Sequence, residues 1–260
     1  MEGSVPKNHK KRKLENNVES EEEKESFKHK TNTPKKLRKD DKVSERAIEI
    51  DEEEEKGSNI KMHRIIVWLR NDLRVHDNPV LDWAVKYGGK NKEVLPVYSF
   101  DPRFINFKVP KYETLKCGPV RARFLHESVI NMREKLEGLG SRLLVTTEKP
   151  EDFLPKLLRT DGDNSLVYQQ EICKEEKDIE EAVKEAQKKK TPKVQIESIW
   201  GSTIYHIDDL PYKAATELPH IYGKFREKSE GTRIRALLPT PKKGELPFPG
   251  KPTKDIEAAT

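Results

Sequence analysis

Charged side chains crowd the end of one short apolar segment. The run Ile65–Leu69 is rich in β-branched residues and too short for a helix of its own, so we expect a buried strand. Charged residues and a helix-capping asparagine follow it directly: Arg70, Asp72, Arg74, Asp77 and Asn78. Ligands of open α/β sheets bind beyond the carboxyl ends of the strands, which makes this loop one candidate side of a crevice. The alternative is a loop held only by its own ion pairs and helix cap.

The elements that must position this loop alternate along the chain. Apolar runs predict five strands, at 64–69, 94–100, 142–147, 165–168 and 194–199. Helical patterns separate them, at 79–87, 119–138, from 150 onward and at 174–189, and one more helix is expected near 220–228. Five strands joined by helices predict an α/β fold with a parallel, doubly wound (Rossmann-like) sheet. Periodicity does not give the order of the strands in that sheet.

The two ends of the chain have a different composition. Residues 1–61 are highly charged with little apolar content, so we expect a disordered tail. Two basic clusters in it are candidate nuclear-localisation signals or weak nucleic-acid contacts: Lys10, Lys11, Arg12 and Lys13, then Lys35, Lys36, Arg38 and Lys39. The alternative is a merely solvated tail. The pattern predicts an α/β domain over 62–200 and a linker over 201–260, where prolines and glycines are frequent.

Composition and missing motifs exclude several classes. The net charge of +5 is a small difference between 51 basic and 46 acidic residues, so it does not by itself indicate nucleic-acid binding. Cys117 and Cys173 suit a reducing compartment without a disulfide framework. The sequence has no apolar run long enough to span a bilayer, which predicts no membrane partner. A Walker phosphate loop, a dinucleotide-binding glycine motif, a zincin motif and a nucleophile elbow are all absent, which argues against a nucleotide-binding enzyme or a hydrolase.

Five segments in order carry a resemblance to a known family. They are RNDLRVHDNPVL from Arg70, YSFDPRF at 98–104, GPVRARFLHESV at 118–129, QQEICKEEKDIE at 169–180 and IWGSTIYHIDDLP at 199–211. Together they resemble the cryptochrome/photolyase family and its DASH branch, over roughly residues 62–250. The resemblance implies the strand order 3-2-1-4-5, which places the loops after strands one and four on either side of one crevice.

The resemblance also implies roles for particular residues. In family members with a folate antenna, a glutamate at the place of Glu171 accepts hydrogen bonds from the pterin, and Gln170 could add an amide contact. A carboxylate suits that task because its two oxygens can meet a planar pair of donors. The alternative is an exposed acid favoured by the dipole of the helix that follows. The family's first-strand loop faces a second domain, so Arg70, Asp72, Arg74, Asp77 and Asn78 are expected at a domain interface.

The family's photochemistry belongs to a helical FAD-binding domain, which the sequence given does not contain. We therefore expect an α/β domain able to bind an antenna chromophore, typically methenyltetrahydrofolate, in a blue-light photoreceptor or DNA photolyase system, without photoactivity of its own. Its expected partners are a separate flavin domain, or a second copy through an exposed apolar face. DNA binding is expected of the full-length family, and here only weakly or through the tail. The alternative from another class is a nuclear interaction scaffold, and the expected location is nuclear or otherwise cytoplasmic.

Overall fold

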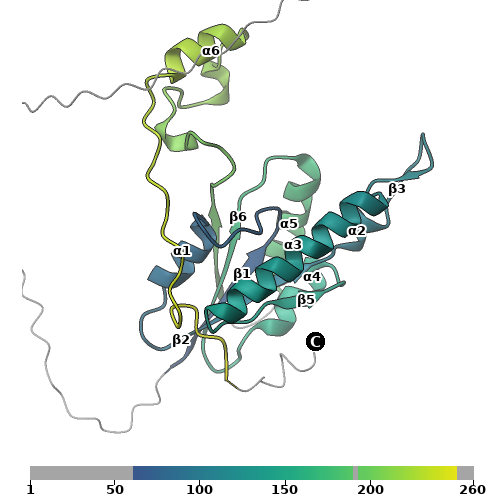
Figure 1. Ribbon diagram of the computed structural model, residues 1–260, viewed down its shortest axis with the longest axis vertical. Helices are drawn as coiled ribbons and strands as arrows, with labels where there is room; N and C mark the ends of the chain where they lie inside the picture. Colours follow the sequence, from purple (N-terminus) through teal and green to yellow (C-terminus); the bar gives the residue numbers. More distant parts are fainter. Residues whose placement is uncertain (1–60, 190–192, 251–260) are drawn as a thin grey trace, which may run out of the picture. The chain divides into compact units, whose positions relative to one another are not determined.

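The computed structural model describes residues 61–189 and 193–250 of the chain. Its main feature is a five-stranded sheet whose strands run parallel in the order β5-β2-β1-β6-β7 (Figure 1). The strands are β1 (His63–Leu69), β2 (Lys92–Ser99), β5 (Leu144–Thr146), β6 (Asp163–Gln169) and β7 (Val194–Ile199). This confirms the predicted parallel α/β sheet and the strand order implied by the resemblance.

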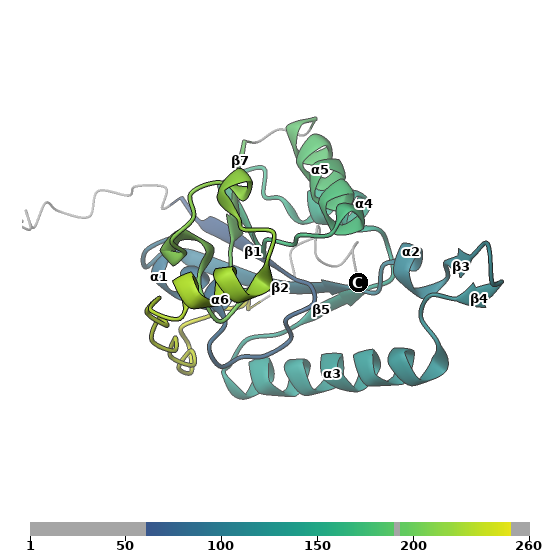
Figure 2. The same ribbon diagram turned by 90° about the horizontal axis from the view of Figure 1, so that it is seen from above.

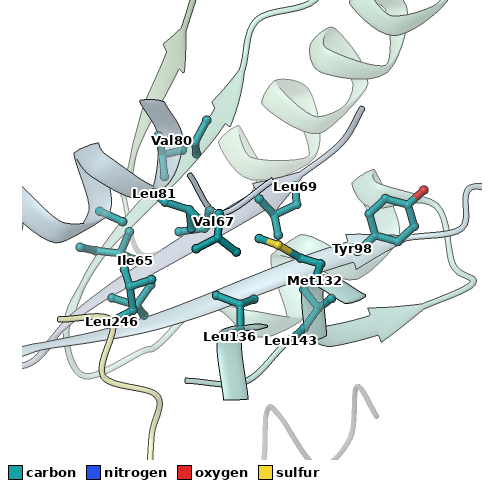
Figure 3. Close-up of a cluster of buried hydrophobic side chains, with 14 of the residues drawn as sticks. Ile65, Val67, Leu69, Val80, Leu81, Tyr98, Met132, Leu136, Leu143 and Leu246 are labelled. Carbon is teal, nitrogen blue, oxygen red and sulfur yellow. The ribbon is translucent and has the colours of Figure 1, made fainter. Parts of the chain in front are cut away.

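Strand β1 lies at the centre of the sheet, and its residues alternate between two cores. Ile65, Val67 and Leu69 pack in one apolar cluster with side chains of α1 (Pro79–Lys86) and α3 (Pro119–Gly138), which Figure 3 shows. Ile66 and Trp68 pack in a second cluster with side chains of α4 (Pro150–Phe153) and α5 (Lys174–Lys188). Since successive side chains of a strand point to opposite faces, one short apolar run supports helices on both sides of the sheet.

The helices cover both faces of the sheet, one apolar cluster on each face. Their bounds are α1 (Pro79–Lys86), α2 (Pro102–Ile105), α3 (Pro119–Gly138), α4 (Pro150–Phe153), α5 (Lys174–Lys188) and α6 (Tyr222–Ser229), with short 3-10 turns η1 (Leu154–Leu157), η2 (Ile207–Asp209) and η3 (Ala215–Glu217). Figure 2 shows α3 on one side of the sheet and α4 with α5 on the other. None of the helices within the described residues is long and apolar enough to cross a membrane.

The segment between β2 and α3 contains a small hairpin that the sequence did not predict. Strands β3 (Lys108–Val109) and β4 (Thr114–Leu115) pair antiparallel where we expected only a loop. Two-residue strands leave no alternation to read, and the turn depends on Glu113 in a left-handed conformation with φ of 53°. In the neighbouring α3, the apolar residues Val120 and Phe124 are exposed, and burial begins only at Val129.

The segment after β7 returns to the sheet. Leu246 is fully buried in the cluster that contains Ile65, and the two side chains lie together in Figure 3. The backbone N–H of Val94, in β2, donates to the carbonyl of Pro247 at 2.7 Å. A domain boundary at residue 200 stays a prediction, but part of the expected linker belongs to the core of the α/β unit.

Candidate functional site

A crevice of about 840 Å³ opens at the carboxyl ends of β1, β6 and β7. Its lining comes from four segments, namely the loop after β1, the end of β6, the turn after β7 and an extended segment near residue 236. The residues are Asn71, Asp72, Arg74, Asp77, Pro79, Gln169, Glu171, Ile199, Trp200, Gly201, Ser202, Thr203, Ile204, His206, Ile234, Arg235, Ala236, Leu237 and Leu238. This is the edge of the sheet at which the sequence predicted a crevice.

Glu171 lies in this crevice with its carboxylate engaged by one neighbour. The side-chain amide of Asn71 donates to Glu171 Oε1 at 2.9 Å, joining the loop after β1 to the loop after β6. Burial raises the pKa of Glu171, while the hydrogen bond from Asn71 and the charge of Arg70 act in the opposite direction. A partly desolvated carboxylate with a single side-chain donor has acceptor capacity left for a ligand.

Gln170 is not among the residues that line the crevice, whereas its neighbour Gln169 is. The backbone N–H of Gln170 donates to the carbonyl of Ile199, so the pairing of β6 with β7 continues through this residue. Because side chains alternate along an extended chain, Gln169 and Glu171 lie on the crevice side and Gln170 lies on the opposite side. A ligand contact by Gln170 stays a prediction.

Arg70 turns away from the crevice and packs inside the domain. Its guanidinium lies 4.5 Å from the centroid of the Trp68 ring and pairs with Glu180 of α5 at 2.5 Å. Both charged side chains are 7% exposed, so the pair is desolvated. The predicted role of Arg70 at a domain interface is untested, but within this domain it ties the loop after β1 to α5.

The other charged residues of the first loop partly staple the loop itself. Arg74 pairs with Asp72 at 3.0 Å and with Asp77 at 3.4 Å, as the simpler alternative predicted. Asn78 caps α1 by accepting from the backbone N–H groups of Val80 and Leu81. Asp72, Arg74 and Asp77 nevertheless line the crevice, so these contacts also shape its wall.

Sequence reasoning missed the wall formed by Ile234–Leu238. These residues follow a long stretch without strand periodicity, so nothing local indicated that they return to the crevice. The signal that could have found them is the apolar pair Leu237 and Leu238 just before a proline-rich stretch, but one sequence gives no reason to place that pair beside β1. Trp200 and His206, which follow β7, are also among the lining residues.

A second, smaller pocket lies between β1, β2 and the helices α3 and α5. Its volume is about 90 Å³, and Trp68, Arg70, Tyr98, Phe104 and Arg121 are among its lining residues. Known ligand pockets usually exceed about 300 Å³. In this conformation the pocket is too small for a chromophore. Among the described residues there is no group of three or more potential metal ligands, and both cysteines are free thiols.

The basic clusters 10–13 and 35–39 lie outside the described residues, and so does almost all of the predicted tail over 1–61. Their roles in nuclear localisation or nucleic-acid contact stay predictions.

Comparison with known proteins identifies the family. A family model described as DNA photolyase matches residues 65–243, which include all of the sheet except the first two residues of β1, and also the crevice wall formed by Ile234–Leu238. The chain belongs to the DNA photolyase family. The match extends past β7 to residue 243 and so includes Ile234–Leu238, but it ends before Leu246 and Pro247.

Individual relatives place the chain in the DASH branch. It is 41% identical over 188 residues to a cryptochrome DASH of Danio rerio, covering 72% of this chain and 35% of the relative. It is also 41% identical over 173 residues to a blue-light photoreceptor of Arabidopsis thaliana, covering 66% and 37%. The chain therefore carries the α/β domain of a DASH-type cryptochrome and spans about a third of the length of these curated relatives.

Solved structures agree with this assignment. The crystal structure of a Synechocystis cryptochrome matches with a TM-score of 0.65 at 33% identity, over 73% of this chain and 38% of that one. A class III photolyase from Agrobacterium tumefaciens matches with a TM-score of 0.58 at 24% identity, over 76% and 38%, which shows the shared fold alone.

Proposed function

We propose that the crevice at the ends of β1, β6 and β7 binds an antenna chromophore of the folate type, methenyltetrahydrofolate, with Glu171 as the main polar contact. The observation that carries the proposal is the half-buried carboxylate of Glu171 on the crevice wall, with one side-chain donor and a raised pKa. When bound, the folate would supply absorption of near-ultraviolet light. The family binds flavin and antenna cofactors, which makes an antenna role the closest fit for its α/β domain.

The size and lining of the crevice fit such a ligand. Its volume of about 840 Å³ lies in the range of known ligand pockets. The loops after β1 and β6 contribute polar side chains such as Asn71 and Glu171, while the turn after β7 and the segment Ile234–Leu238 contribute both aliphatic and polar ones. A pterin has a planar edge of amino and ring N–H donors, and a carboxylate can accept from two such donors at once.

The hydrogen bond from Asn71 indicates how Glu171 stays ready for a ligand. The amide donates to Oε1 and holds the carboxylate toward the crevice without a full counter-charge. The backbone N–H of Glu171 donates to Glu180 at 3.1 Å, which fixes the loop itself. A ligand can therefore bind the second carboxylate oxygen, or replace Asn71, without unfolding the loop.

The photoreceptor or photolyase activity of the family is a proposal for a longer assembly. Among the described residues, helices follow the strands or lie in the segment after β7, and none forms a separate helical domain for a flavin. We propose that this domain delivers excitation to such a flavin domain and that contact with DNA, on which family members act in repair, also belongs to that assembly.

A spectrum tests the proposal. The full chain is mixed with methenyltetrahydrofolate, freed of unbound ligand and examined by absorbance and fluorescence, alongside Glu171→Gln and the control Glu181→Gln. Glu181 lies on α5 outside the crevice and pairs with Lys184. We expect the near-ultraviolet band to be retained by the unchanged protein and the control and to weaken in Glu171→Gln. Retention that is equal in all three proteins would exclude Glu171, and no retention in any would exclude the antenna site.

A further inference from the structure

We propose that the extended segment Ile234–Leu238, hereafter the strap, is the apolar wall of the chromophore site and that Asp77 is the positioning residue that holds it there. The strap would contact the non-polar ring portion of the ligand whose polar edge meets Glu171. The chemical identity of the ligand rests on the proposed function, whereas the attachment of the strap does not.

Two polar contacts hold the strap at its ends. Asp77 Oδ1 accepts a hydrogen bond of 2.9 Å from the backbone N–H of Leu238. Arg235 donates through Nε and Nη2 to the two carboxylate oxygens of Asp209, at 2.6 and 2.9 Å. Further along the chain, Leu246 is fully buried in the core and anchors the segment that follows the strap.

Asp77 makes this contact from a strained backbone conformation. Its φ is 52°, one of two left-handed non-glycine residues in the described part of the chain. Aspartate tolerates this conformation better than most residues, but it still costs free energy relative to the right-handed region. Arg74 lies 3.4 Å from the other carboxylate oxygen and balances the charge. The fold thus maintains a strained residue whose side chain holds the strap.

The strap brings exposed aliphatic side chains to the crevice. Ile234 is 53% and Leu237 71% exposed, and Ile204 on the turn after β7 is 70% exposed. All three line the crevice that also contains Glu171. Apolar side chains left open to water beside a carboxylate favour a ligand with a polar edge and a non-polar body, because burying such a body removes both surfaces from water.

Limited trypsin digestion tests the attachment without any ligand. Trypsin can cut after Arg233 and Arg235, and cleavage after Lys135 in α3 reports unfolding of the whole domain. Asp77→Gly keeps the left-handed backbone and removes the acceptor, whereas the conservative Asp77→Asn keeps both. We expect cleavage in the strap to be about tenfold faster in Asp77→Gly, which corresponds to about 1.4 kcal/mol, with Asp77→Asn close to the unchanged protein. Equal strap cleavage in all three proteins would overturn the role of Asp77.

Binding of methenyltetrahydrofolate tests the apolar wall. Leu237→Ser is compared with Val120→Ser, because both side chains are exposed but Val120 lies on α3 away from the crevice. We expect the first variant to bind about tenfold more weakly and the second to bind normally. Equal binding by both variants overturns the strap as a ligand wall. If the unchanged protein binds no folate, the proposed function and the ligand wall both fail, and the digestion alone decides whether Asp77 holds the strap.

Discussion

Replacing Leu246 by alanine should destabilise the whole α/β domain, although Leu246 lies far along a segment without strand or helix pattern. Its side chain is fully buried in the cluster formed by β1, α1 and α3, beside Ile65 and Leu136. Truncating it removes apolar contacts and leaves a cavity that a close-packed core fills only in part.

The expected loss follows from this burial. Leu→Ala at fully buried sites costs about 2–5 kcal/mol, so we take about 3 kcal/mol for Leu246→Ala. A domain of 150–250 residues loses about 2–4 °C in Tm per kcal/mol, which predicts a decrease of about 6–12 °C. Thermal unfolding followed by circular dichroism measures the change. The segment's hydrogen bond from Val94 to Pro247 should weaken as well, which hydrogen exchange at Val94 reports.

The control is Leu237→Ala, since Leu237 is a leucine of the same segment with 71% of its surface exposed. Its replacement should change stability by no more than about 0.5 kcal/mol. If Leu246→Ala and Leu237→Ala unfold at the same temperature, the segment does not pack against the sheet in solution. The boundary predicted at residue 200 would then be the better description of the domain.

Three further predictions concern the site. Asn78→Ala removes the side-chain oxygen that accepts from two backbone N–H groups of α1, and it should lower the free energy of unfolding in urea by about 1 kcal/mol. An unchanged free energy of unfolding would show that water replaces both hydrogen bonds. Gly201→Ala should cost about 1–3 kcal/mol, because the added Cβ would lie 2.7 Å from Pro79 Cγ; an unchanged Tm would show that the turn after β7 yields freely. Burial raises the pKa of Glu171 above the usual 4.5 of a glutamate. The native state therefore binds the carboxyl proton more tightly than the unfolded chain does. As a result, stability falls as the pH rises from the unfolded pKa through the native pKa. Glu171→Gln should therefore gain stability relative to the unchanged protein as the pH rises above the usual pKa of a glutamate, and a difference in Tm that does not change with pH would contradict the raised pKa.

The sheet was predictable because its strands contain short apolar runs, and the central strand is apolar throughout most of its length. A run such as Ile65–Leu69 is buried on both faces of a parallel sheet and reads as apolar throughout. The helix starts at Pro79, Pro119 and Pro150 were also visible, since proline suits the first helical position. The order of the strands was not readable from local pattern and came from the resemblance alone.

The crevice was only half predictable. Local pattern found the charged loop after strand one, whereas the resemblance supplied Glu171 and the placement of both loops at one crevice. The contact by Gln170 also came from the resemblance, and a difference of one residue along an extended chain changes which side chain faces the crevice. The apolar side comes from Ile234–Leu238, whose position depends on contacts across the chain such as that between Asp77 and Leu238, and no local pattern encodes those.

Residues of the charged loop after β1 pair with one another and also line the crevice, and one of them pairs with α5. Glu180 of α5 accepts from Arg70 Nη1 at 2.5 Å and from the backbone N–H of Glu171 at 3.1 Å through the same oxygen. This buried carboxylate therefore ties the loop after β1 to the loop after β6, and Asn71, next to Arg70, meets Glu171 as a result. The ion pair between Arg70 and Glu180 of α5 therefore fixes the spacing between Asn71 and Glu171, which form the polar wall of the crevice.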